Sequence, residues 1–420
     1  MIQMSHHSFL VLLCSLLYFN ANAQKSLSLK ECEDAFQKNN LLLLAEQYNI
    51  DVSKANVIQA KIWDQPFLSG ELNAISPQDN SYFNIGKNGQ KGLAIQQLIY
   101  LGKKKKYEVE YAKSNTPIAE LQFQQLLKNL NFQLKQSFYT VYFAKEKYNN
   151  LQIQISNIDS LAIAYSVQAN KGNIPLRDVV RLQSLVLSLK NDLIDIQKTI
   201  NDEQETLKTI TGISENIDPV IVLTEIEKKI NIQKIPPIDS LVQLALQKNP
   251  EFVSSLKTID SNEKMLKWQQ SLAIPDLTAG ASYDQNGGAF HNQINLTLGI
   301  PLPLWNKNKG NIQAAKIQLS QAKIQKDYKV LELKAKIENA YSSWNQKQRL
   351  FSQRVLDDGS NLDLVYKGVL QNFLKRNISL LEFTDFMESY NQSIAQLNEL
   401  KKSLLLSCET INYIVNEKIF

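Results

Sequence analysis

The sequence has few of the residues from which catalytic and metal sites are usually built. Its 420 residues include three histidines and three cysteines, and beyond the first ten residues the only histidine is His291. It contains no Gly-x-Gly-x-x-Gly after a predicted strand, no phosphate-binding loop and no His-Glu-x-x-His motif. Serines are plentiful, but none has a paired histidine that could act as its base. We therefore predict no enzyme activity and no catalytic, cofactor-binding or metal-binding residues.

Glycine and proline are also scarce, and so are long apolar runs and excess charge. The chain has 14 glycines and 11 prolines, which favours long helices with few turns. The net charge of +5 gives no reason to expect nucleic-acid binding. After the first two dozen residues no run approaches the eighteen or more apolar residues of a membrane helix. If the chain enters a membrane, it must do so as strands that close into a barrel.

The first 23 residues resemble a secretory signal peptide. An apolar stretch from Phe9 to Phe19 is followed by Ala21-Asn22-Ala23, whose small residues suit cleavage after Ala23. No Lys or Arg precedes the stretch, and a short buried helix is the alternative interpretation. Cys14 follows Leu13, where lipoprotein cleavage would require a small residue. We therefore expect no lipid anchor.

After cleavage the chain would keep two cysteines, Cys32 and Cys408, near its opposite ends. Two cysteines do not make a disulfide framework. We expect both to be buried free thiols.

The most informative feature of the chain is an internal repeat about two hundred residues apart. Gln37-Lys-Asn-Asn recurs as Gln247-Lys-Asn-Pro, and Asn173-Ile-Pro-Leu-Arg-Asp recurs as Asn377-Ile-Ser-Leu-Leu-Glu. A repeat of this size indicates duplication of one large structural element rather than a solenoid. It predicts a first repeat over residues 24–212, a connector over residues 213–237 and a second repeat over residues 238–420.

Each repeat is predicted to begin with a helix and two strands. In the first, a helix from Leu29 to about Asp64 ends before Pro66. The predicted strands cover residues 67–74, 92–101, 275–284 and 291–301. In the last of them Ile294, Leu296 and Leu298 alternate with less apolar residues. This pattern is typical of a lipid-facing barrel strand and equally of a half-buried soluble sheet.

Each repeat then continues as a long helical hairpin. Residues 103–170 have no glycine and only Pro117 as a possible break, and as one helix they would extend roughly 100 Å. Apolar residues at 3.5-residue spacing continue on both sides of the turn at residues 172–175, which predicts an antiparallel coiled coil. The second hairpin is predicted from residues 309–373 and a return helix from Leu380, with Asp358-Gly359 as a possible interruption.

Charged residues mark the junctions and the turns. Lys103 to Lys106 lie where a strand passes into a helix, and we interpret them as a water-exposed junction or a solvated face. By the repeat, Asp178 corresponds to Glu382 and Arg181 to Asp385. Carboxylates around a symmetry axis would form a cation-attracting ring. Ordinary surface charges at a helix start are the alternative.

The repeated order of helix, two strands and long hairpin resembles the TolC-type outer-membrane efflux proteins over the whole mature chain. The most specific motifs are Ile300-Pro-Leu-Pro-Leu-Trp-Asn-Lys-Asn-Lys-Gly-Asn-Ile312 and the turns Lys171-Gly-Asn-Ile174 and Lys375-Arg-Asn-Ile378. Leu207-Lys-Thr-Ile-Thr-Gly212 resembles the end of the family's first half. The segment from Ile300 is particularly similar to the heavy-metal efflux, CusC/CzcC-like branch.

The resemblance implies a mainly α fold with a transmembrane β part and a function as a passive export duct. Three subunits would each give four strands to a twelve-stranded barrel in outer-membrane lipid and their hairpins to a periplasmic tunnel. The expected partners are two further copies of the chain, a periplasmic adaptor and an inner-membrane pump, with the RND type favoured. Metal ions, drugs or other small molecules would pass through the duct.

The resemblance also implies roles for residues at the hairpin ends. The acidic gate positions fall on Glu382 and Asp385. The adaptor-contact tips fall on the following residues: Gly172, Asn173, Asp178, Arg376 and Asn377. Arg376 departs from the family's tip glycine, and arginine takes a positive φ less readily. We therefore expect the second tip to have a different shape from the first.

An exported periplasmic coiled-coil adaptor or scaffold is the alternative function. Such a protein would also carry a signal peptide and heptad repeats. It predicts one hairpin flanked by lipoyl-like strands, whereas this chain has two predicted hairpins and apolar-faced strands.

Overall fold

The computed structural model describes residues 25–76, 80–222, 229, 231–232, 234–287, 289–305, 307–353 and 360–420. The predicted signal peptide and the possible interruption at Asp358-Gly359 lie outside these residues. The chain forms two compact units. One unit comprises Met1–Leu44, Leu126–Ala245 and Leu333–Phe420, and the other comprises Ala45–Gln125 and Leu246–Glu332. Each unit therefore takes segments from both predicted repeats.

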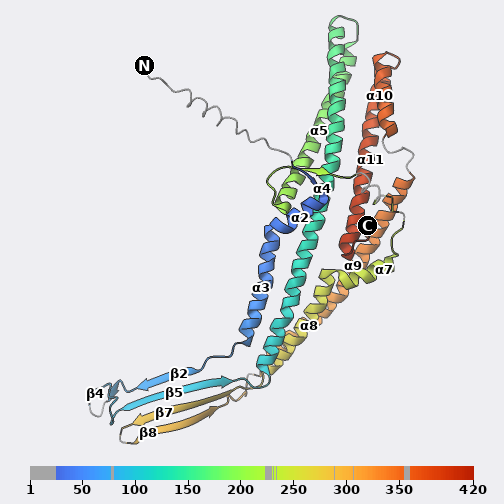
Figure 1. Cartoon of the computed structure of the whole chain (residues 1–420). Helices are drawn as coiled ribbons and strands as arrows, with labels where there is room; N and C mark the ends of the chain where they lie inside the picture. The colour runs from blue at the N-terminus through green and yellow to red at the C-terminus, as the bar shows by residue number, and fades with distance from the viewer. Residues whose placement is uncertain are drawn as a thin grey trace, which may run out of the picture. The chain divides into compact units, whose positions relative to one another are not determined.

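The second of these units contains a four-stranded antiparallel sheet in the order β2-β5-β7-β8 (Figure 1). The strands are β2 (Phe67–Leu72), β5 (Gln90–Ile99), β7 (Leu277–Asn286) and β8 (Phe290–Gly299). Between β2 and β5, the short strands β3 (Ile75–Ser76) and β4 (Ser81–Tyr82) form a hairpin of their own. The four predicted strands are thus present, within a few residues of their expected ends.

The register places apolar residues from all four strands on one face of the sheet, whereas Phe67 and Leu98 lie on the opposite face. Leu68 pairs with Ile95, Ile95 with Ala281, and Ala281 with Leu296. Because side chains alternate along a strand, residues paired in this way lie on the same face. The opposite face carries polar residues such as Ser282 and its partner Asn295. The sheet has one oily face and one polar face, as the sequence predicted.

Two helix pairs lead into and out of this sheet. The helices before the strands are α3 (Leu41–Lys61) and α8 (Pro250–Ser271), and those after them are α4 (Lys104–Asn170) and α9 (Lys309–Ser352). Tyr111 of α4 stacks on Trp268 of α8, with ring centroids 5.6 Å apart. Lys104 is buried, and its Nζ lies 2.7 Å from Asp276 Oδ1. For Lys104 the expectation of a water-exposed junction or solvated face is therefore wrong, because the carboxylate of Asp276 permits its burial.

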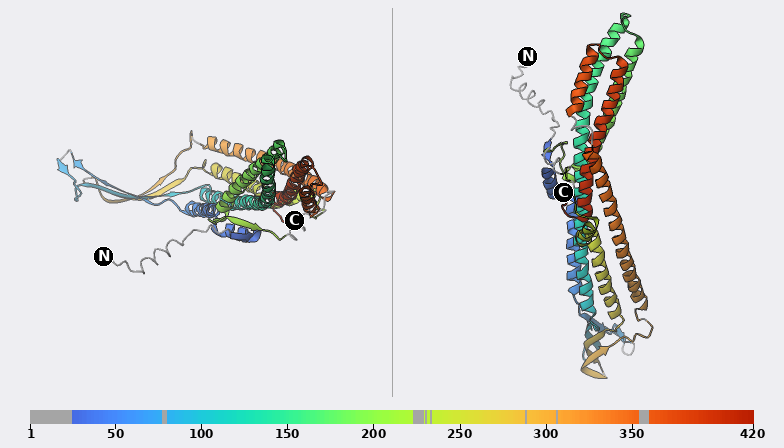
Figure 2. Two further views of the ribbon diagram at one scale, coloured as in Figure 1. Left: turned by 90° about the horizontal axis from the view of Figure 1, so that it is seen from above. Right: turned by 90° about the vertical axis from the view of Figure 1, so that its right-hand side faces the viewer.

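The other unit contains the two helical hairpins. The first joins α4 to α5 (Leu176–Thr211), and the second joins α10 (Ser360–Leu374) to α11 (Leu380–Val415). Helix α4 continues through Pro117 without a break. The two views of Figure 2 show the hairpins side by side. One core cluster joins them; its buried members include Leu151, Ile158, Leu182, Val186, Leu189, Phe373, Phe383, Met387 and Tyr390.

On the first hairpin, these buried positions follow the predicted 3.5-residue spacing. Leu182, Val186 and Leu189 of α5 are all almost fully buried. The coiled-coil pattern therefore identified the packing faces of α4 and α5 in the first hairpin correctly. Aromatic rings complete the core, and Phe373 stacks on Phe383 with centroids 4.3 Å apart.

A second structural feature of this unit was not predicted. Strand β1 (Lys25–Ser28) pairs in parallel with β6 (Ile217–Val220), which lies inside the predicted connector. Helix α2 (Leu29–Asn39) follows β1 and begins with a capping box between Ser28 and Glu31. The two free thiols, Cys32 and Cys408, are buried as predicted.

A buried carboxylate holds several of these segments. Glu409 of α11 is 2% exposed and pairs with Lys135 of α4 at 3.0 Å and with Lys229 of the connector at 2.5 Å. Lys135 also lies 3.5 Å from Glu33 of α2. The ion pairs connect three helices and the connector within one unit.

Among the described residues, a further helix is α7 (Ile238–Lys248), which is separated from α8 by Asn249. The Asn249 side chain accepts hydrogen bonds from the backbone of Glu251 and Phe252, and Pro250 occupies the first helical turn. In the part of the chain that the structure describes, no helix combines the length and apolarity needed to cross a membrane.

Candidate functional site: hairpin tips and a polar groove

The two hairpins end in turns of the same construction. In the first, Gly172 N–H donates to Ala169 O at 2.9 Å and Asn173 N–H donates to Gln168 O at 3.0 Å. In the second, Arg376 N–H donates to Phe373 O and Asn377 N–H to Asn372 O, both at 2.9 Å. These paired bonds satisfy the last carbonyls of each outgoing helix, as in a Schellman motif.

The second tip therefore does not differ in shape, and the expectation drawn from Arg376 is wrong. Arg376 adopts φ +60° and Gly172 adopts φ +77°, so both are left-handed. The side chains repeat as well: Asn173 Nδ2 donates to Gln168 Oε1 at 2.8 Å, and Asn377 Nδ2 donates to Asn372 Oδ1 at 3.1 Å. The hydrogen bonds of the turn outweigh the modest cost of a left-handed arginine.

The tips expose most of the residues predicted to contact an adaptor. Gly172, Asn173, Arg376 and Asn377 are exposed, and Asp178 is half-buried. Below the second tip, Phe373 and Phe383 pack closely into the core. Each tip is thus an exposed polar turn on a rigid helical pair, which suits recognition by another protein.

The return helices begin differently. Pro175 precedes α5 and makes no side-chain cap, whereas Ser379 caps α11 in a capping box with Glu382. The Ser379 backbone N–H and hydroxyl both donate to Glu382 Oε2 at 2.7 Å. These hydrogen bonds lower the pKa of the Glu382 carboxyl. Glu382 thus stabilises the start of α11. The sequence had left this role open as the alternative to a gate role.

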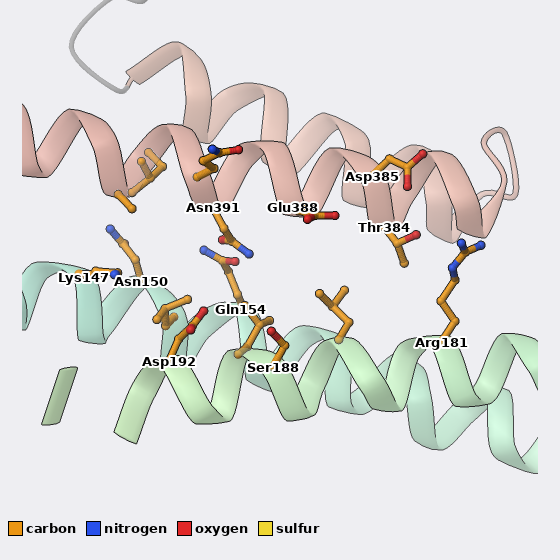
Figure 3. A pocket seen from close by; sticks show the side chains of 16 residues that line it. Lys147, Asn150, Gln154, Arg181, Ser188, Asp192, Thr384, Asp385, Glu388 and Asn391 are labelled. Atoms are coloured by element: carbon orange, nitrogen blue, oxygen red, sulfur yellow. The ribbon is translucent and has the colours of Figure 1, made fainter. Parts of the chain in front are cut away.

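A polar groove lies behind the tips, between α11 on one side and α4 and α5 on the other (Figure 3). Its volume is about 520 Å³. Its polar and charged lining residues are Lys147, Asn150, Gln154, Arg181, Ser188, Asp192, Thr384, Asp385, Glu388, Asn391 and Gln392. Three carboxylates and two basic groups make the lining slightly acidic.

Two amide oxygens in this groove have no hydrogen-bond partner. Gln154 is 3% exposed, and neither its Oε1 nor Asn391 Oδ1 meets a donor. Figure 3 shows the side chain of Gln154 directed from α4 into the gap toward α11. A buried acceptor without a protein donor costs stability.

Of the two predicted gate residues, Asp385 lines the groove and Glu382 does not. Asp385 and Arg181 both line the groove, and Arg181 reaches from α5 toward Thr384 and Asp385 (Figure 3). Glu382 lies outside the lining and is bound to its own cap. Asp178 is 3.6 Å from the guanidinium of Arg177.

The groove residues Gln154 and Asn391 were missed by the sequence analysis. The available signal was an amide beside the apolar seam of each helix, since Gln154 lies between Leu151 and Ile158 and Asn391 follows Tyr390. Polar residues next to a coiled-coil seam commonly weaken or specify helix pairing. The spacing of apolar residues alone does not identify Gln154 and Asn391.

The described residues offer little for metal binding or catalysis. Within them, no group of three or more His, Cys, Asp and Glu side chains is arranged to hold a metal ion. His291 lies in β8 and is exposed. What the arrangement provides is a sheet with two unlike faces and two rigid hairpins.

Comparison with known proteins identifies related sequences. Residues 241–353 match the family model described as Outer membrane efflux protein. The cobalt-zinc-cadmium resistance protein CzcC of Cupriavidus metallidurans is 21% identical over 309 residues, which cover 72% of this chain and 69% of that protein. These matches confirm the family resemblance read from the sequence.

Solved structures share the fold. CusC, whose structures concern folding and transmembrane channel formation, aligns with a TM-score of 0.72 at 16% identity over 92% of this chain and 91% of its own. The outer membrane channel CmeC of Campylobacter jejuni aligns with a TM-score of 0.73 at 14% identity over 93% and 86%. The predicted fold class, mainly α with a smaller β part as in these channel structures, is confirmed.

Proposed function

We propose that this chain, which is related to the outer membrane efflux proteins and has the fold of their channels, is the outer-membrane duct of a multi-part efflux system. The observation that carries the proposal is the four-stranded sheet with one largely apolar face and one largely polar face. In a membrane barrel the apolar face meets lipid and the polar face lines the pore. The hairpins then form a tunnel in the periplasm.

A trimer completes the duct. Four strands have two unpaired edges, β2 and β8, and unpaired edges are not tolerated in lipid. Three copies supply twelve strands and allow closure. The helices support the same assembly, because large apolar side chains such as Tyr48 of α3 and Ile324 of α9 are exposed in the single chain. Neighbouring subunits would cover such surfaces.

A passive duct requires partner proteins that supply the energy for transport. The family is one of passive channels rather than enzymes, so the energy for transport must come from another protein. We assign that role to an inner-membrane pump of the RND type, connected through a periplasmic adaptor. The exposed tips at Gly172, Asn173, Arg376 and Asn377, with Asp178 beside them, are the proposed adaptor contacts.

The cargo we propose is a metal cation. The support is the similarity to the cobalt-zinc-cadmium resistance protein CzcC over most of both chains. Within the duct, Asp385 and Glu382 supply negative charge near the end of the tunnel. Such charge favours cation entry without requiring a binding site.

Two measurements test the proposed function. The mature chain, fractionated from an expressing Gram-negative cell, should remain in the outer membrane after salt and carbonate washing. The purified trimer should conduct ions in planar bilayers. A chain released by carbonate would instead indicate the periplasmic scaffold, which two hairpins and an apolar sheet face do not support.

A further inference from the structure

The chain leaves β8 through an unusually exposed apolar segment, residues 300–305. The exposed fractions are 74% for Leu302, 64% for Leu304 and 91% for Trp305. Ile300 is also exposed. This segment follows the end of strand pairing, because Gly299 is the last residue of β8 with a partner.

The segment continues the apolar row of β8 beyond the strand. Within the strand the row consists of Ile294, Leu296 and Leu298, which span about 14 Å along the chain, or about 10 Å of depth at a 45° tilt. The apolar band of an outer-membrane barrel is about 25 Å tall. Three residues cover less than half of it. With Ile300 and Leu302 the row reaches about 19 Å, by the same rise and tilt.

The segment is not suited to pairing with a strand of another copy. Pro301 and Pro303 have no N–H to donate to a ladder. Leu304 N–H instead donates to Leu302 O at 2.8 Å, which closes a tight turn around Pro303. The turn leaves Leu302, Leu304 and Trp305 exposed on one short stretch.

Other aromatic residues lie at the same rim of the sheet. Ile99 pairs with Leu277 and Thr278 with Gly299, so these strand ends are level. Just beyond them, Trp63 lies against Tyr100 with ring centroids 5.7 Å apart. Indole and phenol rings at the end of barrel strands are typical of the membrane–water interface. Lys307 and Lys309 follow Trp305 and suit the anionic headgroups there.

We propose that residues 300–305 form a membrane anchor that inserts into the periplasmic leaflet of the outer membrane. Ile300, Leu302 and Leu304 contact acyl chains, and Trp305 lies at the level of the phospholipid headgroups. The inference rests on the proposed function, since it requires the sheet to be in a bilayer. It adds a lipid-binding segment that lies outside the strands.

The test uses the full mature chain in phosphatidylcholine–phosphatidylglycerol vesicles with unbrominated or brominated acyl chains. Subtracting the fluorescence of the Trp305→Phe variant from that of the wild type gives the emission of Trp305 alone. The corresponding Trp344→Phe difference supplies a buried control, since Trp344 is 3% exposed. We expect bromines at carbons 6 and 7 to quench Trp305 about twofold or more, and bromines at carbons 11 and 12 to quench it less, because indole prefers the interface. Trp344 should not respond.

A second variant checks the apolar contacts. Leu302→Asn with Leu304→Asn should reduce the quenching of Trp305 to about half or less, because both anchoring side chains become polar. Leu187→Asn is the matched control, since Leu187 of α5 is exposed to a similar degree. It should leave Trp305 quenching unchanged.

The outcomes separate the anchor from the proposed function. If the chain floats with the vesicles but Trp305 is not quenched by brominated lipid, the anchor is overturned and the duct stands. A blue-shifted, unquenched Trp305 would mean that a second copy covers it, and this also overturns the anchor. If the chain does not float with vesicles at all, the duct itself fails.

Discussion

Gly172 and Arg376 occupy the same position in two turns about two hundred residues apart, and both have a left-handed backbone, with φ +77° and +60°. Their N–H groups donate at the same distance, 2.9 Å, to the carbonyls of Ala169 and Phe373. Gly172 adopts this conformation without strain because it has no Cβ, whereas Arg376 adopts it at a cost in conformational free energy.

The first prediction follows from that cost. Gly172→Ala should destabilise the hairpin by about 1 kcal/mol, because an L side chain is strained at positive φ. No heavy atom lies within 4 Å of the added Cβ, so the effect reports the backbone alone. Gly368→Ala is the control, since Gly368 lies within α10 and also has open space around its Cβ. It should stabilise by about 0.5–1 kcal/mol. Thermal unfolding followed by circular dichroism measures both, and equal shifts would contradict the strain.

The second prediction concerns the buried carboxylate. Glu409→Gln should destabilise the chain by about 3 kcal/mol, because Lys135 and Lys229 lose their shared counter-charge. The matched control is Asp260→Asn, which breaks an exposed pair with Lys264 and should cost less than about 0.5 kcal/mol. Denaturant titration of the two variants should therefore give clearly different midpoints. Similar midpoints would mean that the Glu409 pairs add little.

The third prediction is the pH dependence of that site. Burial raises the pKa of Glu409, but Lys135 and Lys229 outweigh burial and hold it below the ordinary 4.5. A carboxyl whose folded pKa is depressed stabilises the protein above its unfolded pKa and loses that contribution as pH falls through the folded value. The stability difference between wild type and Glu409→Gln should therefore shrink as pH falls below about 4.5, and remain constant from pH 5 to 8. A difference that persists at low pH would contradict the assignment.

The fourth prediction separates charge from helix capping at the proposed gate. Glu382→Gln keeps the capping box, because glutamine also accepts from Ser379, but it removes the charge. Combined with Asp385→Asn, it should weaken block by cations in planar bilayers, because the charge that attracts cations is removed. Glu382→Ala disrupts the cap and is therefore a less clean test. Unchanged conductance and block in the Gln/Asn double variant would remove the gate assignment.

The fifth prediction tests the unpartnered amide in the polar groove. Gln154→Met has a similar shape without the buried acceptor and should stabilise the chain by about 1 kcal/mol. Gln122→Met is the control on the same helix, because Gln122 is exposed and should give little change. Thermal unfolding measures the change in stability of both variants. Destabilisation by Gln154→Met would contradict the assignment of an unpartnered acceptor.

Much of this fold could be read from repeated local patterns. Alternation in residues 294–298 predicted an apolar sheet face, and the register with Ala281 and Ala279 places it as expected. The 3.5-residue spacing around Leu182 and Val186 predicted the core of the hairpins, where both are buried. These patterns are readable because strand and helix periods fix which side chains share a face.

Other features depended on partners distant in sequence. The parallel pairing of Lys25–Ser28 with Ile217–Val220 joins segments with no common pattern. Lys104 appeared to belong to an exposed basic run until Asp276 was found beside it. Arg376 by itself predicts a different shape for the second tip, but backbone hydrogen bonds hold it in the same left-handed conformation as Gly172.

The sequence by itself determined the periodicities, the duplication and therefore the two kinds of building element, since these follow from the local geometry of helices and strands. Only the tertiary structure decided which charges are buried, such as Glu409 among its lysines, and which amides are left without partners, such as Gln154. The reason is physical: burial and electrostatic pairing depend on distances between residues far apart in the chain, and no local period encodes those distances.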